Sequence, residues 1–477
     1  MKIAVFSTHV LWPSHYETEL ELIQSHIDNS DTVINVVCNG DFKHCDQNMT
    51  AAAKNCYKCI NKRLVGVNLI DGKYIIKGID APINYKIDIP ASQEAIKQLM
   101  YRNFDIGYAA LSSLISFRRD PMIHPSDSDL LSFLINKGVA VYEWVKDFLH
   151  KEKIDKVYVF NGRFIYNRAI LRASQQLGIP VDVHERGADV KHYELYKNTY
   201  PHDIKYIYNK INIFWETSEK SEEQKLADAQ RFFIDRKNGV EQSWFSFVKN
   251  QAQGKLPSNW DVNKKNIVFF NSSEDEFAAI GDDWKRFIYP TQVEAIETIT
   301  KDFLSQPLFH FYLRIHPNLM KVENKDMEKL LSIQSRNLTL IYPDDDVSSY
   351  ALIEQANKVI TFGSTVGIEA AFWKTPSILL GSCFYRDLGA TYNPSTQEEL
   401  YSMLNQDLIP LPNLGALKYG FYLKNFGIPF KYYKAEGIFS GTFKGYDLNK
   451  PKHTLPIRIL RKIYPNEVPV KLMNRYL

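Results

Sequence analysis

Long apolar runs are missing from this chain of 477 residues. The longest stretch without Asp, Glu, Lys or Arg runs from Ile3 to Tyr16 and contains His, Ser and Pro. A helix that spans a membrane needs roughly 20 apolar residues, so we expect no transmembrane segment. The start, Met1-Lys2 followed by Ile-Ala-Val-Phe, also lacks the longer apolar core of a secretory signal. We therefore expect a cytoplasmic protein.

A strong excess of charge is missing as well. The 58 Lys and Arg residues against 55 Asp and Glu give a net charge of +3, so no chain-wide basic field exists that would attract nucleic acid. The excess is concentrated in the tail, where residues 453–477 hold five Lys or Arg and one Glu. Their apolar neighbours predict that this tail packs on the body of the protein. Its basic side chains would still be free to meet an anionic membrane.

Apolar strands alternate with helical segments along most of the chain. This alternation predicts a parallel sheet that is covered on both faces. The strands are expected at residues 2–10, 31–39, 153–163, 179–187, 265–273, 310–318, 338–346, 358–364 and 376–381. No Gly-x-Gly-x-x-Gly follows any of them, which disfavours a dinucleotide oxidoreductase.

The loop at residues 254–265 is rich in Gly, Pro, Asn and Lys and predicts a domain boundary. The predicted fold class is α/β, with two Rossmann-like domains that face each other across a cleft. We place the first domain at residues 1–255, the second at 256–440, and a basic tail at 441–477. In open parallel sheets ligands bind outside the carboxyl ends of the strands, so we expect the site there.

Three strand-end loops of the second domain carry residues suited to binding an anion. They are Asn271, Ser272 and Ser273 after one strand, Arg314 and His316 after another, and Gly363, Ser364 and Thr365 after a third, with Glu369 on the helix that follows. Hydroxyls and backbone N–H groups can hold a phosphate, and His or Arg can offset the charge of a leaving nucleotide. The carboxylate of Glu369 could accept hydrogen bonds from ribose or sugar hydroxyls. Taken singly, each loop also fits ordinary caps and turns.

The order of these motifs resembles the donor-binding half of GT-B glycosyltransferases. A strand, His-Pro-Asn, a later strand, Gly-Ser-Thr, a helix with Glu, and a strand after Lys-Thr-Pro occur between residues 265 and 385. The chain is most similar to the bacterial capsular polysaccharide biosynthesis group, whose members include Kdo transferases. The resemblance implies that His316, Ser364 and Thr365 contact the donor phosphate and that catalysis needs no metal ion.

The resemblance also implies the partners. The donor would be a CMP-, UDP- or GDP-linked sugar. The acceptor would be a growing surface glycan or a lipid-linked glycan of capsule or O-antigen type, at the inner face of the cell membrane. Two rival functions remain open, namely a nucleotide-sugar 2-epimerase and a catalytically silent subunit that binds a glycan or a nucleotide.

In this fold the acceptor and the general base come from the first domain, so its strand ends supply the candidates. Asn161 and Arg163 follow one strand, Glu185 and Arg186 end another, and His15 follows the first. Glu185 is the first candidate for the base and His15 the second. The alternative for Glu185 is a buried ion pair with Arg186 or Arg163.

Four of the five cysteines lie close together in the sequence. Cys38, Cys45, Cys56 and Cys59 include one CxxC pair, so they could hold a structural zinc ion that pins a long loop. The alternative is a set of reduced, unconnected thiols. Disulfides are less expected in a chain without an export signal.

Overall fold

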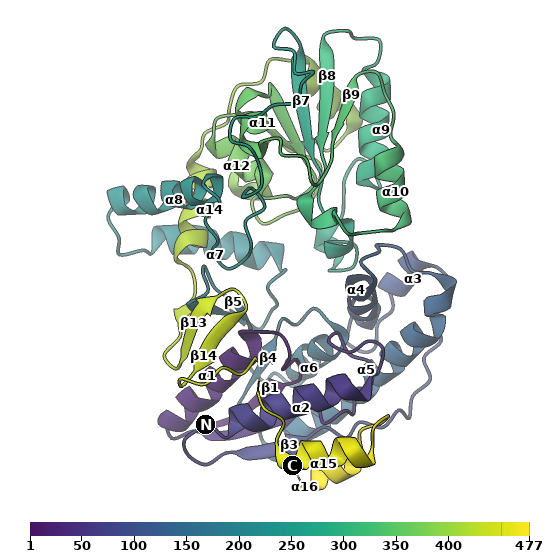
Figure 1. Ribbon diagram of the computed structural model, residues 1–477, viewed down its shortest axis with the longest axis vertical. Coiled ribbons are helices and arrows are strands. Elements are labelled where there is room, and N and C mark those ends of the chain that lie inside the picture. The colour runs from purple at the N-terminus through teal and green to yellow at the C-terminus, as the bar shows by residue number, and fades with distance from the viewer. Residues whose placement is uncertain (450, 477) are drawn as a thin grey trace. The chain divides into compact units, whose positions relative to one another are not determined.

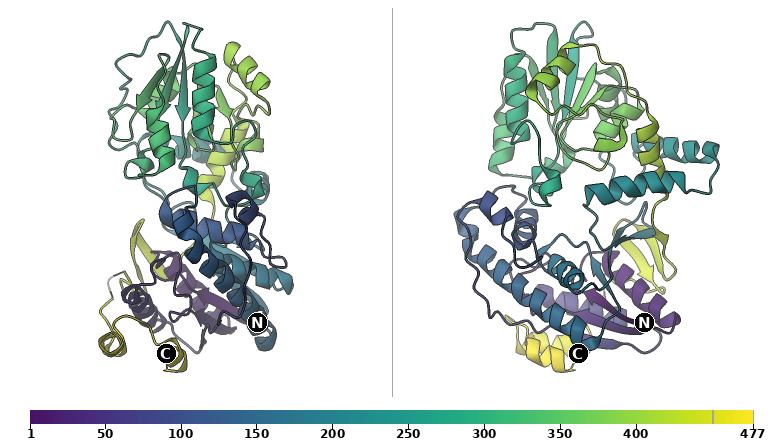
Figure 2. Two further views of the ribbon diagram at one scale, coloured as in Figure 1. Left: turned by 90° about the vertical axis from the view of Figure 1, so that its right-hand side faces the viewer. Right: turned by 180° about the vertical axis from the view of Figure 1, so that it is seen from behind.

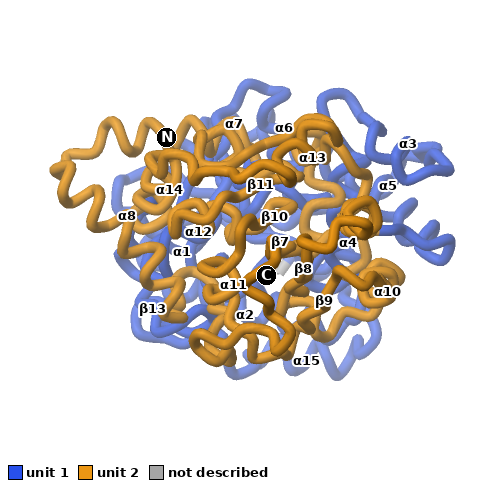
Figure 3. Tube along the Cα trace, turned by 90° about the horizontal axis from the view of Figure 1, so that it is seen from above, with its two compact units in different colours: residues 1–118, 122–202, 426–477 blue, residues 119–121, 203–425 orange. Residues whose placement is uncertain are grey.

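The computed structural model describes residues 1–449 and 451–476, which form two compact units (Figures 1 and 3). The first unit contains residues 1–118, 122–202 and 426–477, and the second contains residues 119–121 and 203–425. Each unit is built on its own sheet with helices on both faces. The predicted fold class of two Rossmann-like α/β domains is confirmed.

The sheet of the first unit has the order β12-β6-β5-β4-β1-β2-β3. Its strands are β1 (Lys2–Ser7), β2 (Thr32–Val37), β3 (Ile75–Gly78), β4 (Lys156–Phe160), β5 (Val181–Arg186), β6 (His192–Lys197) and β12 (Ile428–Pro429). The strands β1 to β5 run parallel to one another, whereas β6 runs antiparallel to β5. The order reverses between β1 and β4, which is the topological switch point where open α/β sheets bind ligands.

The remaining elements of the first unit are mostly helices. They are α1 (His15–Asp28), α2 (Ala53–Val67), α3 (Gln93–Lys97), α4 (Ile106–Arg118), α5 (Ser128–Glu152), α6 (Ile165–Gln176), α15 (Leu455–Ile463) and α16 (Val470–Tyr476), together with the two-stranded ribbon of β13 (Tyr433–Gly437) and β14 (Ser440–Phe443).

The second unit holds a five-stranded sheet in which all neighbours are parallel, in the order β11-β10-β7-β8-β9. Its strands are β7 (Lys265–Phe270), β8 (Phe309–Arg314), β9 (Leu338–Ile341), β10 (Lys358–Thr361) and β11 (Ser377–Leu379). Its helices are α7 (Ile204–Glu216), α8 (Glu222–Lys237), α9 (Gln292–Asp302), α10 (Lys325–Ser332), α11 (Ser349–Gln355), α12 (Val366–Phe372), α13 (Gln397–Asn405) and α14 (Leu414–Asn425). Here the switch point lies between β7 and β10.

Burial on both faces explains why β7 reads as a continuous apolar run. Ile267 and Phe269 join the apolar cluster on one face, while Val268 and Phe270 join the cluster on the other. Successive side chains of a strand point to opposite faces, so both sets must be apolar. Phe270 pairs in register with Thr361 of β10 and Arg314 of β8. The loops that follow these three strands therefore start at one edge of the sheet.

The division into units differs from the predicted domain boundaries. Residues 203–255, which we placed in the first domain, group with the second unit, because α8 packs on α14 and Phe233 stacks on Phe372 of α12. Residues 426–440, which we placed in the second domain, group with the first unit. In that segment β12 extends the first sheet, and the carboxylate of Glu21 accepts three backbone N–H groups of residues 431–433.

The basic tail packs on the first unit through α15 and α16. Ile457 and Met473 are buried against Ala53, Tyr57 and Ile60 of α2. Within residues 1–449 and 451–476, none of the helices combines the length and the apolar character that crossing a bilayer requires.

Candidate functional site

The loops after β7 and β8 are joined at the carboxyl edge of the second sheet. The backbone N–H of His316 donates to Oδ1 of Asn271 at 2.8 Å, and the N–H of Asn318 donates to Nδ1 of His316 at 3.1 Å. Because Nδ1 accepts a hydrogen bond, the neutral imidazole carries its proton on Nε2. The ring meets Phe247 edge-on, with centroids 5.1 Å apart. His316 is thereby fixed as a hydrogen-bond donor at the tip of β8.

Positive charge gathers around this imidazole. Burial, and after it repulsion by the guanidinium groups of Arg314, Arg119 and Arg236, together lower the pKa of His316 to about 4. The ring is therefore neutral at pH 7, and the surrounding guanidinium groups, of which Arg119 and Arg236 are paired with Asp275 and Glu369, supply further hydrogen-bond donors. A site with a neutral donor in a field of guanidinium groups favours an anionic ligand.

The loop after β10 depends on Gly363. Its φ of 132° is left-handed, and a Cβ atom at this position would lie 3.1 Å from the carbonyl oxygen of Ser382. Only glycine accepts both conditions without strain. The hydroxyl of Tyr385 donates to the carbonyl of Ser364 at 2.5 Å and fixes the next residue. Ser364 and Thr365 remain half-exposed at the edge of the sheet.

Arg236 of α8 reaches this loop, although nothing in the sequence pattern singled it out. Its Nε donates to Glu369 at 2.9 Å, and its Nη2 donates to the hydroxyl of Thr365 at 3.1 Å. The Arg236 side chain is 37% exposed, whereas the Glu369 side chain is 3% exposed. Glu369 also accepts the hydroxyls of Thr365, at 3.1 Å, and of Tyr350. The oxygens that we assigned to ribose or sugar hydroxyls are thus engaged within the unit, where they hold Arg236 beside Thr365.

Other predicted donor residues are buried and hold the loops in place. The guanidinium of Arg314 donates to the carbonyls of Tyr342, at 2.5 Å, and Asp345, at 3.2 Å. Ser272 is buried, and its backbone N–H donates to the side chain of Gln292 at 2.7 Å.

Arg119 is a further cation that sequence reasoning missed. Its Nε donates to Asp275 at 2.6 Å and its Nη2 to the hydroxyl of Ser273 at 3.1 Å. Ser273 itself is buried and also donates to Asp275 at 2.5 Å. The first of the three loops therefore contributes a bound guanidinium in addition to its own polar groups.

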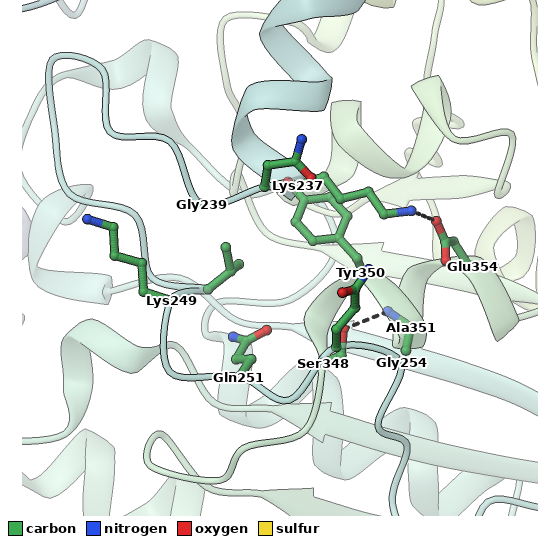
Figure 4. A pocket seen from close by; sticks show the side chains of 12 residues that line it. Lys237, Gly239, Lys249, Gln251, Gly254, Ser348, Tyr350, Ala351 and Glu354 are labelled. Atoms are coloured by element: carbon green, nitrogen blue, oxygen red, sulfur yellow. Dashed lines mark hydrogen bonds and ion pairs between the residues drawn. The ribbon is translucent and has the colours of Figure 1, made fainter.

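A cavity of about 390 Å³ adjoins this arrangement (Figure 4). It is lined by residues 237–239, by five residues between 248 and 254, by Ser348, which caps α11, and by Tyr350, Ala351 and Glu354 of α11. Its two lysines are neutralised, because Lys237 pairs with Glu354 and Lys249 pairs with Glu241. Tyr350 lines the cavity and bonds to Glu369, which connects the cavity to the Arg236 cluster. Its amide and hydroxyl groups suit a polar, uncharged ligand group.

The predicted acceptor-side residues converge in the first unit at its own switch point. Glu185 accepts the amide of Asn161 at 2.8 Å and the backbone N–H of Arg186 at 3.1 Å. The Nε2 atom of His15 lies 3.3 Å from the other face of the same carboxylate, at Oε1. The His15 ring packs on Phe160, with centroids 4.2 Å apart, and burial lowers its pKa well below the usual value. The Glu185 side chain remains 22% exposed.

The two predicted arginines of the first unit are held by other partners. Nε of Arg163 donates to the hydroxyl of Ser112 at 2.6 Å. The guanidinium of Arg186 lies 5.3 Å from the ring centre of Phe439 and donates to the carbonyl of Pro13 at 3.5 Å.

The cysteines are present as free thiols. Burial raises the pKa of Cys38 and of Cys59 to about 12 and also raises the pKa of Cys45 and Cys56, so the thiols stay protonated at neutral pH. Among the described residues, which include all five cysteines, no group of three or more His, Cys, Asp or Glu side chains is arranged to hold a metal ion. The arrangement gives no support to the predicted structural zinc site.

Two Rossmann-like units with polar clusters at their switch points define a double-Rossmann α/β protein. Residues 286–407 match the model of the family described as capsule polysaccharide biosynthesis protein. The predicted resemblance to this group is confirmed over that segment, which includes His316, Ser364, Thr365 and Glu369. No curated protein matches the chain.

Solved structures with some likeness include a transferase and an epimerase. The beta Kdo 2,4 transferase KpsC of Thermosulfurimonas dismutans is 12% identical, with a TM-score of 0.37, over 56% of this chain and 80% of that chain. The UDP-GlcNAc 2-epimerase of Methanocaldococcus jannaschii, in complex with UDP-GlcNAc and UDP, is 13% identical, with a TM-score of 0.25, over 88% of this chain and 98% of that chain. Likenesses at these TM-scores carry no conclusion about the reaction.

Proposed function

We propose that this chain is a glycosyltransferase that uses a nucleotide-activated sugar in capsule polysaccharide synthesis. The observation that supports this most is the cluster at the ends of β10, β7 and β8, where the neutral donor His316 lies in the field of three guanidinium groups. His316, Ser364, Thr365 and Glu369 of this site lie within the segment that matches the capsule polysaccharide family, whereas β7, Arg119 and Arg236 lie outside it. A phosphate ester of a nucleotide sugar has the charge and the acceptor oxygens that such a cluster favours.

In this proposal the donor phosphate lies among three kinds of group. Nε2–H of His316 and the hydroxyl of Ser364 donate hydrogen bonds, while Thr365, whose hydroxyl donates to Glu369, lines the phosphate site. Arg236 supplies a guanidinium that Glu369 holds in position. The cavity beside Tyr350 accommodates the nucleoside part. These cations stabilise the charge on the departing nucleotide, so the reaction needs no metal ion.

The acceptor hydroxyl is activated by Glu185 of the first unit. A carboxylate that keeps one exposed edge, while Asn161 and a backbone N–H fix its orientation, can remove a proton from an incoming hydroxyl. His15, 3.3 Å away, stabilises the orientation of that carboxylate. The acceptor is a growing surface glycan or a lipid-linked glycan, and the reaction takes place in the cytoplasm at the inner face of the membrane.

A nucleotide-binding experiment tests the donor site. The thermal shift caused by CMP, CDP, UDP, GDP and dTDP identifies the nucleotide that stabilises the fold, and titration then gives its Kd. Arg236→Gln removes a charge-assisted hydrogen bond worth about 1.5–3 kcal/mol, so Kd should rise about 10- to 100-fold. Arg231→Gln is the matched control, because Arg231 is on the same helix, is 65% exposed and pairs with Asp235. An unchanged Kd for Arg236→Gln would contradict the proposed site.

A turnover experiment separates the proposal from its rivals. A transferase releases free nucleotide from the sugar nucleotide when a glycan acceptor is added, whereas a 2-epimerase converts its substrate without any acceptor. Glu185→Gln should abolish the acceptor-dependent release and leave nucleotide binding unchanged, because Glu185 lies in the other unit. A protein that binds nucleotide but releases nothing with any acceptor, before and after this substitution, would be a silent binding subunit.

A further inference from the structure

The helix α15 exposes a row of large apolar side chains beside basic ones. Leu455, Ile459 and Ile463 are 65%, 50% and 60% exposed. Their spacing of four residues places them in one row along the helix. Arg458 and Lys462 are exposed on the flank of this row. We call these five residues the α15 outer face.

The outer face belongs to a helix that is firmly held on its other side. Ile457 is fully buried against α2. The hydroxyl of Tyr57 lies 3.4, 3.0 and 2.9 Å from the carbonyl oxygens of Leu460, Tyr464 and Glu467. Both views of Figure 2 show α15 and α16 at the periphery of the first unit. The apolar row is therefore presented outward by a folded anchor and does not result from a frayed end.

The charge around the outer face has one dominant sign. Residues 452–476 contain six Lys or Arg residues and only one acid, Glu467. The neighbouring helix α2 adds the exposed side chains Lys54 and Lys58 and contains no Asp or Glu. After the effect of burial, Arg461 and Lys58 lower the pKa of His453 by repulsion, which shows that cations of α2 and of the tail lie within electrostatic range of each other.

From this geometry we infer that the α15 outer face docks on the surface of an anionic phospholipid bilayer. Exposed apolar side chains enter the boundary between headgroups and acyl chains, while flanking Lys and Arg meet the phosphates. A row of three apolar side chains alone gives weak adsorption, so the lipid charge is an essential part of the binding. The inference deepens the proposed location of the reaction at a membrane. Adsorption requires no turnover, so it can fail or succeed independently of the proposed glycosyl transfer.

The test is co-sedimentation of the full chain with vesicles. We expect binding to vesicles of 30% phosphatidylglycerol in phosphatidylcholine and little binding to pure phosphatidylcholine. Raising the salt from about 0.1 M to about 1 M shortens the Debye length from about 10 Å to about 3 Å, so it should release the protein. Leu455→Gln/Ile459→Gln/Ile463→Gln should reduce binding to the level seen with pure phosphatidylcholine.

A second variant tests the contribution of the basic side chains to vesicle binding. Because each basic side chain near such a surface contributes about 1 kcal/mol, Arg458→Gln/Lys462→Gln should weaken binding on the order of 20-fold. The control for the apolar triple variant is Val262→Gln/Leu308→Gln/Ile409→Gln, which replaces three side chains elsewhere that are 80%, 60% and 75% exposed. The control for the basic variant is Lys151→Gln. Both controls should bind like the wild type.

Three results would overturn the inference. They are equal binding to both vesicle types, wild-type binding by the apolar triple variant, and no vesicle binding at all. In the last case, sedimentation velocity without lipid would show whether the outer face instead joins two copies of the chain, with a dimer that the triple variant loses. All variants must keep the wild-type melting temperature, which we expect because every substituted side chain is exposed.

Discussion

Glu369→Gln is the most informative single substitution in the second unit. The wild-type carboxylate is buried and accepts hydrogen bonds from Arg236 at 2.9 Å, from Thr365 at 3.1 Å and from Tyr350. Glutamine keeps the shape and one acceptor oxygen. It removes the negative charge and turns an amide N–H₂ group toward groups that are themselves donors. The substitution therefore tests whether Glu369 anchors Arg236 or contacts the ligand.

The expected cost follows from the contacts that are lost. A hydrogen bond between charged groups contributes about 1.5–3 kcal/mol, and the half-exposed guanidinium of Arg236 recovers part of this from water. We expect the free energy of unfolding to fall by about 2 kcal/mol, which lowers Tm by roughly 4–8 °C for a unit of this size. The free energy of unfolding lost by the double variant Glu369→Gln/Arg236→Gln should be smaller, by about 1 kcal/mol, than the sum of the losses in the two single variants. The reason is that the double variant leaves neither partner of the ion pair unpaired.

Thermal unfolding with and without the stabilising nucleotide measures both roles. Glu354→Gln serves as the control, because that carboxylate is 39% exposed in its pair with Lys237 and should cost less than about 0.5 kcal/mol. If Glu369→Gln melts at the wild-type temperature but loses nucleotide affinity, the anchoring role is refuted and a direct contact with the ribose or sugar takes its place. Strict additivity in the double variant would also refute the coupling to Arg236.

Three further outcomes are expected. Burial raises the pKa of Glu19 to about 8, so the folded protein holds a proton that the unfolded chain releases above about pH 4.5. The stability that this proton contributes is fully present below that pH and is lost as the pH rises through 8. The free energies of unfolding at pH 5 and pH 9 should therefore differ less for Glu19→Gln than for the wild type. Gly363→Ala should lower both Tm and nucleotide affinity, because the added Cβ meets a carbonyl oxygen at 3.1 Å. The control Gly389→Ala should lower Tm only, because its φ is 74° and nothing lies within 4 Å of the added Cβ. Tyr57→Phe removes the hydroxyl that bonds to the carbonyls of Tyr464 and Glu467. Amide hydrogen exchange in the tail should then accelerate by roughly 5- to 30-fold, corresponding to about 1–2 kcal/mol, and unchanged exchange would contradict the anchor.

Local patterns were enough to predict the strands of the second sheet and β1, β2, β4 and β5 of the first, whereas β3, β6 and β12 were not predicted. Residues 267–270 of β7 are a continuous apolar run because both faces of the strand are buried, and the small polar residues that follow, 271–273, mark the carboxyl edge. The proximity of Glu185, Asn161 and His15 has a similar origin, since Glu185 lies at the carboxyl end of β5 and the other two follow β4 and β1 of the same sheet. The unit boundaries could not be predicted from the sequence. The apolar faces of α7 and α8 specify that these helices pack but leave their partner undetermined, and the partner is α14, far along the chain.

The cationic groups at the donor site could not be predicted from local sequence patterns, for a related reason. His316 is neutral at pH 7, and Nδ1 is already occupied, so the motif that drew attention to this loop supplies one hydrogen-bond donor and no net charge. A guanidinium group comes from Arg236, which lies 133 positions before its partner Glu369 and is brought to the site by the packing of α8. Within its own helix Arg236 is one of several charged residues and resembles an ordinary solvated position. A strand-end motif can therefore locate the ligand's hydrogen-bond partners, whereas the cations that determine its affinity become visible only when the helices that carry them have been placed.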